Sequence, residues 1–313
     1  MFAGHNKQKV RFGTVFPQNK GAKAIIVILP GLSEFCEKYF ELAHNLLERQ
    51  YATYVIDWQG QGRSYRPLSK TPQKRISYGF ENDLEDLHIL IKDYIRSSAI
   101  HPDIGVIPLI MLGHSFGANI GLRYLHDHPD VFKAAAFSAP FLGIKSVNFL
   151  PLTLQRTLSF LGNELAGKSY LPGGQDYVPA MRTGEKQKLF SSDEIRGRIH
   201  HEWFNFETEL RQGNITWSWI HQALKSCAIL SRHKYLNKIT TPSLLAIAGK
   251  EFLVNNSSIR RAARIMPNTT LVEIPDARHE ILMERDEIRD HFLKEFDELM
   301  KNHILNKNKD TTA

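Results

Sequence analysis

Ser115 lies between two glycines in the stretch GHSFG (residues 113–117), after an apolar run and before a segment with helical periodicity. This is the G-x-S-x-G pattern of a nucleophile elbow, a tight strand-to-helix turn whose flanking residues must lack side chains. A serine hydroxyl is a weak nucleophile near neutral pH, so it needs an adjacent base that an acid orients. The motif also arises by chance, so its context has to decide whether Ser115 is the nucleophile rather than a competing serine such as Ser64 or Ser138.

The base is predicted from chain order, which for an elbow serine runs serine, acid, histidine. Of the 14 histidines, His279 is the one in a loop after the last predicted strand and before the last predicted helix. His114 adjoins the serine, and because a flanking residue in an elbow points away from the reaction centre, local packing or hydrogen bonding is predicted for it. Surface or packing positions are predicted for His88, His126 and His128.

The acid should stand at the end of a strand between the serine and the histidine. Glu251 is the carboxylate in the loop after the predicted strand of residues 241–249. Asp276 is the alternative, but it is three residues from His279 and can hardly face the edge of that ring. Asp57 precedes Ser115, so we interpret its glycine loop as a structural turn below the site. Glu251 is therefore the favoured acid.

An oxyanion hole needs two backbone N–H groups, one from the residue after the nucleophile and one from the loop after an early strand. Here those residues are Phe116 and Leu32. No Walker pattern, no G-x-G-x-x-G after the first strand and no metal-ligand cluster occurs in the sequence, so neither a cofactor nor a metal is predicted.

Strands and helices alternate along the chain. Strands separated by single helices form parallel crossover units, so the sequence predicts an α/β protein with a mostly parallel central sheet flanked by helices. The predicted strands are residues 23–31, 52–57, 107–115, 133–140, 241–249 and 270–274. The predicted helices are residues 34–50, 80–97, 116–129 and a last amphipathic helix that carries Ile288, Phe292, Phe296 and Leu299.

The alternation breaks once, between residues 141 and 239. Connections in α/β proteins are typically ~2–6 residues long, so this stretch reads as an inserted, largely helical cap. It would lie over the carboxyl ends of the strands, where ligands bind. The predicted boundaries are residues 1–140 and 240–303 for the core, 141–239 for the cap and 304–313 for a flexible tail. Some of the cap aromatics should face substrate and the others should form the cap's own core: Trp203, Phe204, Phe206, Trp217 and Trp219.

Length, composition and charge restrict the class of protein and its cellular location. The chain has 313 residues, 42% hydrophobic and 23% charged, as is ordinary for a globular protein. Its longest apolar runs are shorter than the ~20 residues of a spanning helix, and no secretory signal peptide is visible. Two cysteines predict no disulfide framework, which favours a cytoplasmic location. The net charge of +7 fits a solvated basic surface or peripheral contact with the anionic inner face of a membrane. Nucleic acid is not an expected partner.

The segments 29–64, 113–120, 241–256 and 277–287, taken together, resemble the α/β-hydrolase family of bacterial lysophospholipases and monoglyceride lipases. The likeness covers nearly the whole chain, is weakest in the cap and is closest to the lysophospholipase branch. It implies the α/β-hydrolase fold, Ser115 as nucleophile, His279 as base, Glu251 as acid and amide donors at Leu32 and Phe116. The chain departs from the wider family's pattern in the oxyanion loop, with Pro30 in place of a histidine and Ser33 in place of a glycine.

The function we expect is a cofactor-free serine esterase of single-chain acyl glycerolipids, a lysophospholipase first, with transacylation as a variant. Alternatives are a monoacylglycerol lipase, a broad carboxylesterase and a catalytically inactive hydrolase fold used for binding. A proline-type aminopeptidase would want a carboxylate-lined amine pocket, which cap residues Glu202, Glu207 and Glu209 could supply.

Overall fold

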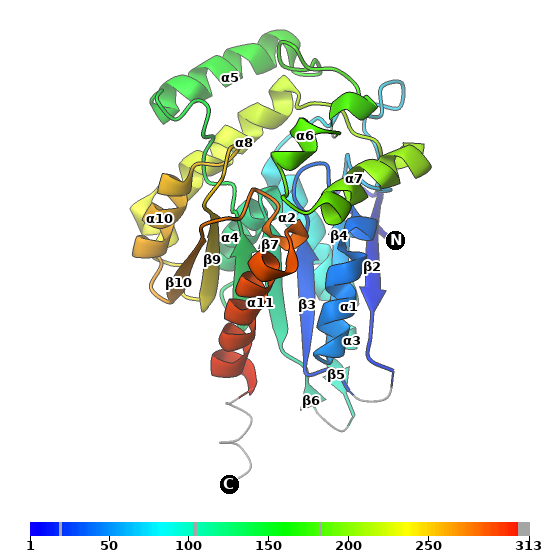
Figure 1. Cartoon of the computed structure of the whole chain (residues 1–313), viewed down its shortest axis with the longest axis vertical. Helices are drawn as coiled ribbons and strands as arrows, with labels where there is room; N and C mark the ends of the chain where they lie inside the picture. The colour runs from blue at the N-terminus through cyan, green and yellow to red at the C-terminus, as the bar shows by residue number, and fades with distance from the viewer. Residues whose placement is uncertain (19–20, 103–104, 182, 306–313) are drawn as a thin grey trace.

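The computed structural model describes residues 1–18, 21–102, 105–181 and 183–305. Its centre is an eight-stranded sheet of order β1-β2-β4-β3-β7-β8-β9-β10 (Figure 1). The strands from β4 to β10 are parallel, and β1 and β2 are antiparallel at one edge. The strands are β1 (Phe2–Ala3), β2 (Lys9–Val15), β3 (Ala24–Leu29), β4 (Tyr51–Asp57), β7 (Leu109–His114), β8 (Ala134–Ser138), β9 (Ser243–Ala248) and β10 (Thr269–Ile274). A separate ribbon pairs β5 (Ile100–His101) with β6 (Gly105–Val106).

The inner strands form where the sequence has short, continuous apolar runs. Every residue of β3, β4, β7, β8 and β9 is buried, as expected of parallel strands covered on both faces. The predicted mostly parallel sheet is confirmed. The sequence did not predict β2, whose exposed and half-buried residues alternate only weakly.

Helices cover both faces of the sheet. Figure 1 shows α1 and α11 in front of it, with α2 and α4 behind. The helices are α1 (Phe40–Glu48), α2 (Phe80–Ile89), α3 (Arg96–Ser98), α4 (Phe116–Asp127), α10 (Asn256–Ile265) and α11 (Asp286–Met300). The predicted helix of residues 80–97 runs through α2, a π-helical turn η2 (Leu90–Ile95) and α3. A 3-10 turn, η1 (Cys36–Tyr39), precedes α1.

The β8–β9 segment (residues 139–242) stands above the end of the sheet at which β7 meets α4 (Figure 1). It holds α5 (Leu152–Ala166), η3 (Pro179–Met181), α6 (Glu185–Lys188), α7 (Glu194–Phe206), η4 (Thr208–Leu210), α8 (Trp217–Leu230) and α9 (His233–Leu236). A small core joins it to the sheet domain, where Phe35 packs with Tyr177, Phe204 and Leu210. The division into core and cap stays a prediction.

The last described turns are η5 (Ile281–Met283) and η6 (Lys301–Leu305). Two residues of the predicted tail belong to η6, and Ile304 is buried because it packs on the main core. The rest of that prediction, residues 306–313, lies outside the described residues. No helix in the described part of the chain is both long and apolar enough to span a membrane.

Candidate active site

Ser115 occupies the turn between β7 and α4, with a left-handed φ of 49°. The turn is tight on both sides. A Cβ on Gly113 would come within 2.9 Å of the Cα of Ala118, and one on Gly117 would come within 2.0 Å of the carbonyl oxygen of Leu29. Both glycines therefore let β7, α4 and β3 approach each other, as the elbow pattern predicts.

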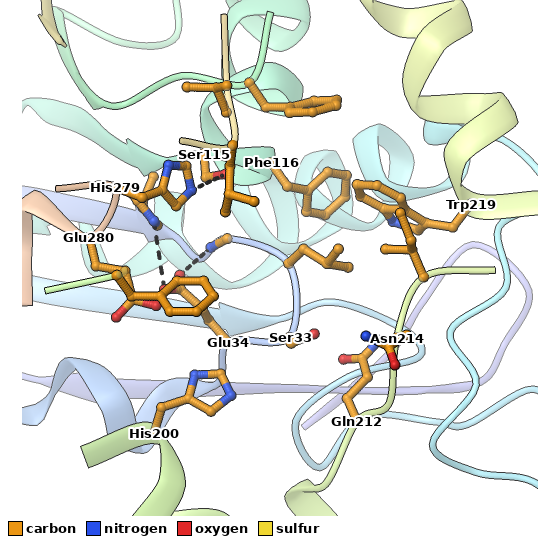
Figure 2. Close-up of a pocket in the computed structure, with 18 of the residues that line it drawn as sticks. Ser33, Glu34, Ser115, Phe116, His200, Gln212, Asn214, Trp219, His279 and Glu280 are labelled. Atoms are coloured by element: carbon orange, nitrogen blue, oxygen red, sulfur yellow. Dashed lines mark hydrogen bonds and ion pairs between the residues drawn. The ribbon is translucent and has the colours of Figure 1, made fainter. Parts of the chain in front are cut away.

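The structure brings His279 and Glu251 to this serine. Nε2 of His279 lies 3.0 Å from Oγ of Ser115, and Nδ1 lies 2.8 Å from Oε2 of Glu251. Glu251 follows β9, and its other oxygen accepts the backbone N–H groups of Phe252 and Leu253 at 2.8 and 2.7 Å. The three side chains thus form one hydrogen-bonded line, which Figure 2 shows at its Ser115–His279 end.

The charges in this line follow from its contacts. Burial opposes ionisation of Glu251, but the charge and hydrogen bond of His279 and the two amides outweigh it and lower the pKa of Glu251 to about 2. An ionised carboxylate only accepts, so Nδ1 of His279 carries the proton and Nε2 is left to accept from Ser115. Burial also disfavours the charged form of His279, yet Glu251 outweighs it and raises the pKa of His279 above its ordinary value.

The competing residues make other contacts. Asp276 is exposed and pairs with Lys250 at 2.7 Å. His114 does not point away from the site as the elbow pattern predicts, because it lines the same cavity and its ring centroid lies 5.0 Å from that of His279. Its Nδ1 makes a local contact, 3.1 Å from the carbonyl oxygen of Ser138. Burial lowers the pKa of His114 to about 4, despite the nearby carboxylate of Glu34. His114 therefore stays neutral and packs locally, in line with its predicted role.

The two predicted oxyanion donors belong to residues that line the same cavity as Ser115. Phe116 is the first residue of α4, and the first N–H groups of a helix have no partner within it. Leu32 lies in the loop after β3, and no described residue accepts a hydrogen bond from its amide. Both amides are therefore available to a ligand at Ser115.

The loop that carries Leu32 is held by two polar side chains that the sequence reasoning missed. The carboxylate of Glu34 accepts the N–H of Gly31 and the ammonium of Lys38, the latter at 2.7 Å. The amide nitrogen of Gln61 donates to the carbonyl oxygens of Gly31 and Glu34, both at 2.8 Å. Gln61 belongs to the glycine loop after β4, which supports the interpretation of that loop as a turn beneath the site. No motif marks Glu34 or Gln61.

A cavity of about 370 Å³ opens onto Ser115, within the range of small-molecule sites. Its walls come from the sheet domain and from the β8–β9 segment. In Figure 2, Phe116 and Trp219 lie to one side of Ser115, Glu34, Glu280 and His200 to another, and Gln212 and Asn214 across the cavity from His279. The apolar wall is made by Leu32, Phe116, Phe141, Ile144, Met181, Phe190, Phe204, Ile215, Trp219, Ile220, Leu253 and Val254.

The β8–β9 segment only partly matches what its sequence suggested. Of the five aromatics, Phe204 and Trp219 line the cavity, whereas Phe206 is 79% exposed. None of the arginines that the structure describes in this segment lines it. Arg196 pairs with Glu41, and Arg211 donates to the carbonyl oxygen of Phe204. The candidate amine-site carboxylates also lie outside the cavity lining: Glu202, Glu207 and Glu209.

Within the described ranges, no group of three or more histidine, cysteine, aspartate or glutamate side chains could hold a metal ion. The cavity presents a hydroxyl, an imidazole oriented by a carboxylate, and two amide donors. That set can form and break an acyl-enzyme.

Known proteins resemble this chain over most of its length. The family described as serine aminopeptidase, S33 (Hydrolase_4) matches residues 20–286. A probable lysophospholipase L2 of Haemophilus influenzae is 25% identical over 97% of this chain and 90% of its own. Lysophospholipase L2 of Escherichia coli K12 is 28% identical over 92% of this chain and 83% of its own.

Among solved structures, a soluble variant of monoglyceride lipase from Saccharomyces cerevisiae superposes with a TM-score of 0.75. It is 18% identical and covers 97% of this chain and 95% of its own, so the likeness concerns the fold. The predicted α/β-hydrolase fold is confirmed.

Proposed function

Because this chain belongs to the serine aminopeptidase S33 family and is a serine ester hydrolase, we propose that its substrates are single-chain acyl glycerolipids, lysophospholipids first and monoglycerides second. The observation that carries the proposal is the line of Ser115, His279 and Glu251 beside a largely apolar cavity. Two full-length relatives bear the name lysophospholipase, and a further relative from mouse, matched over 44% of this chain, is a monoglyceride lipase.

In the proposed mechanism, Oγ of Ser115 attacks the ester carbonyl carbon while Nε2 of His279 takes the hydroxyl proton. The amides of Leu32 and Phe116 donate to the oxyanion of the tetrahedral intermediate. His279 then gives its proton to the leaving glycerol oxygen, and an acyl-enzyme remains on Ser115. Water activated by His279 releases the fatty acid, and another alcohol in place of water would give transacylation. No step requires a cofactor or a metal.

The β8–β9 segment would act as a cap that closes the cavity over the acyl chain. Its contribution to the walls is mainly apolar, from residues such as Ile144, Met181 and Phe190. A peptidase role has less support, because an amine pocket needs carboxylates and the candidates Glu202, Glu207 and Glu209 lie outside the lining.

The deciding experiment gives the purified protein a lysophosphatidylethanolamine, a monoacylglycerol and an aminoacyl anilide. We expect fatty acid release from the first two and no cleavage of the third. A fluorophosphonate probe should label the wild type and a Ser138→Ala variant, but not a folded Ser115→Ala variant. Faster cleavage of the anilide would favour the peptidase, and labelling that survives loss of the Ser115 hydroxyl would remove it as nucleophile.

Peripheral contact with a lipid surface is part of this proposal. Helix α5 exposes a stripe of leucines at helical spacing, Leu154, Leu158, Leu161 and Leu165, which are 42%, 49%, 50% and 85% exposed. In Figure 1, α5 is the outermost helix of the β8–β9 segment, on the side away from the sheet. Lys168, just beyond α5, is exposed and can meet anionic head groups.

Co-sedimentation with anionic vesicles tests this contact. Leu158→Ser should weaken binding, whereas Leu271→Ser, at a leucine 39% exposed on β10, should not. Binding should also weaken as salt rises, because exposed charges are screened within ~10 Å at 0.1 M. Equal binding by both variants would exclude α5 as the docking surface.

A further inference from the structure

Two polar side-chain atoms of the cavity wall are buried with no hydrogen-bond partner among the described residues. They are Oε1 of Gln212 and Nε1 of Trp219, on side chains that are 5% and 3% exposed. A buried polar atom without a partner costs folding free energy, so each such atom calls for an explanation. In a cavity that must hold a substrate, the substrate can supply the partner.

The two atoms lie in different surroundings. The indole of Trp219 stands among aromatic rings, with centroids 5.9, 5.7 and 6.0 Å from those of Phe80, Phe116 and Phe141. That side of the cavity suits a hydrocarbon chain. Gln212 instead stands in the loop between η4 and α8, beside Gly213 and Asn214, which also line the cavity.

The amide oxygen of Asn214 is already committed, because it accepts the backbone N–H of Gln175 at 2.9 Å. Gln212 is therefore the neighbouring amide whose oxygen is left for a ligand. Figure 2 shows both amides across the cavity from His279, apart from the side of Phe116 and Trp219.

We propose that Gln212 binds the free hydroxyl of the substrate's glycerol and thereby selects esters that keep this hydroxyl; the inference rests on the proposed function. With the ester carbonyl at Ser115 and the acyl chain along the aromatic wall, the alcohol part is what remains to reach Gln212. A hydroxyl both donates and accepts, so it satisfies an amide oxygen. Both lysophospholipids and monoglycerides carry one, whereas a second acyl chain replaces it.

The test compares three esters of one fatty acid: a 1-acyl lysophosphatidylcholine, its analogue that lacks the 2-hydroxyl, and a p-nitrophenyl ester. For the wild type, we expect kcat/KM to be about tenfold or more higher with the hydroxyl than without it, as one hydrogen bond from a buried group allows. Gln212→Met keeps the length of the side chain and should abolish this preference. Its loss of kcat/KM should be smaller on the p-nitrophenyl ester than on the hydroxyl-bearing ester, since the p-nitrophenyl leaving group has no hydroxyl.

The chain offers a matched control in Gln222 on α8. Its Oε1 is also buried without a partner among the described residues, yet it does not line the cavity. Gln222→Met should therefore keep the full preference for the hydroxyl-bearing ester.

The outcomes separate this inference from the function on which it rests. An undiminished hydroxyl preference in Gln212→Met, or equal loss on all three esters, would overturn the role of Gln212. Hydrolysis of the p-nitrophenyl ester alone by the wild type would overturn the proposed substrate class, and this inference with it.

Discussion

Helices α4 and α5 have similar lengths and opposite surroundings. In α4 the ten residues Phe116–Leu125 are buried, whereas α5 buries Ser159 alone among its fifteen residues. Helix α4 is enclosed by the sheet and by α2 and α8, and it begins at the proposed nucleophile. Helix α5 packs on one side only, against α8, and presents its leucines outward. Helix α4 is therefore fixed by the protein around it, whereas α5 leaves most of its surface exposed.

The same contrast runs through the site. On the sheet side, Ser115, His279 and Glu251 already have their hydrogen bonds before any substrate arrives. On the β8–β9 side, Gln212 lines the cavity, and its Oε1 has no hydrogen-bond partner among the described residues. Preorganised groups act on the rate of the chemical step, and groups completed by the substrate act on its selection. Variants of the two regions should therefore change different kinetic constants.

The largest effect should follow from Glu251→Gln. An amide can donate to Nδ1 of His279 and hold the wrong tautomer, which should reduce kcat by about a thousandfold or more. Asp276→Asn is the matched control, since Asp276 is exposed and bound to Lys250, and it should leave kcat unchanged. Steady-state kinetics on a water-soluble p-nitrophenyl ester measure both. If Asp276→Asn were the more damaging change, the acid would be misassigned.

The sequence could predict the three side chains of the candidate triad for a physical reason. The elbow follows a continuous apolar strand and needs glycines at fixed offsets from the serine, because larger side chains would collide with neighbouring backbone. Ser115 can therefore be recognised from the sequence around it. His279 and Glu251 follow strands of the same sheet, and parallel strands bring their carboxyl ends to one edge. Glu34 and Gln61 could not be predicted, because their contacts depend on how the loops after β3 and β4 pack together.

The sequence predicted that the β8–β9 segment is an insertion, but it did not predict which of its side chains are exposed or paired. Helical periodicity indicates an apolar face, but it does not say whether protein or lipid covers that face, so the exposure of Leu158 and Leu161 had no sequence signal. No sequence pattern indicates either that Arg196 of this segment pairs with Glu41 and Asp286 on the sheet domain. Strand β2 was missed for a related reason, since it pairs with β4 across a long stretch of chain.

The second-largest effect should be a loss of stability when Gly117 is replaced. A methyl group on Gly117 would collide with the carbonyl oxygen of Leu29, so Gly117→Ala should cost about 1–3 kcal/mol of unfolding free energy or more. Gly13 on β2 is the control, because a Cβ there would meet only Cys36 at 3.7 Å. Urea denaturation compares the two variants. Equal stability would mean that the elbow is less tightly enclosed than its contacts indicate.

A smaller effect should appear in selectivity. The cavity of about 370 Å³ suits one acyl chain, so a two-chain phospholipid should be hydrolysed at least about tenfold more slowly than its single-chain counterpart in the same mixed micelles. Met181→Ala should enlarge the cavity and so reduce the difference in rate between the single-chain and the two-chain lipid. Hydrolysis of a short p-nitrophenyl ester should not change. A wild type that hydrolyses both lipids equally would contradict the single-chain cavity.

The smallest effect we expect is a shift in pH dependence. Neutral His279 must accept the proton of Ser115, so activity should rise with pH through the pKa of His279. Burial lowers that pKa, but the charge and hydrogen bond of Glu251 outweigh it, so the rise should be centred above the ordinary value of 6.5. Besides Glu251, the charged and titratable groups around His279 are Glu280, Glu34, Lys38 and His114.

A variant of Glu280 tests how much a buried charge near His279 contributes to the pKa of that histidine. Its carboxylate is 3% exposed, lies 2.8 Å from Nζ of Lys38 and helps to raise the pKa of His279. Glu280→Gln removes a negative charge that favours the imidazolium, so the rise in kcat/KM should move to lower pH. Glu202→Gln removes the same charge from the β8–β9 segment, where the side chain is 52% exposed, and water and salt should screen it. Equal shifts from the two variants would show that the enclosed and the open region do not differ in the strength of their electrostatic fields.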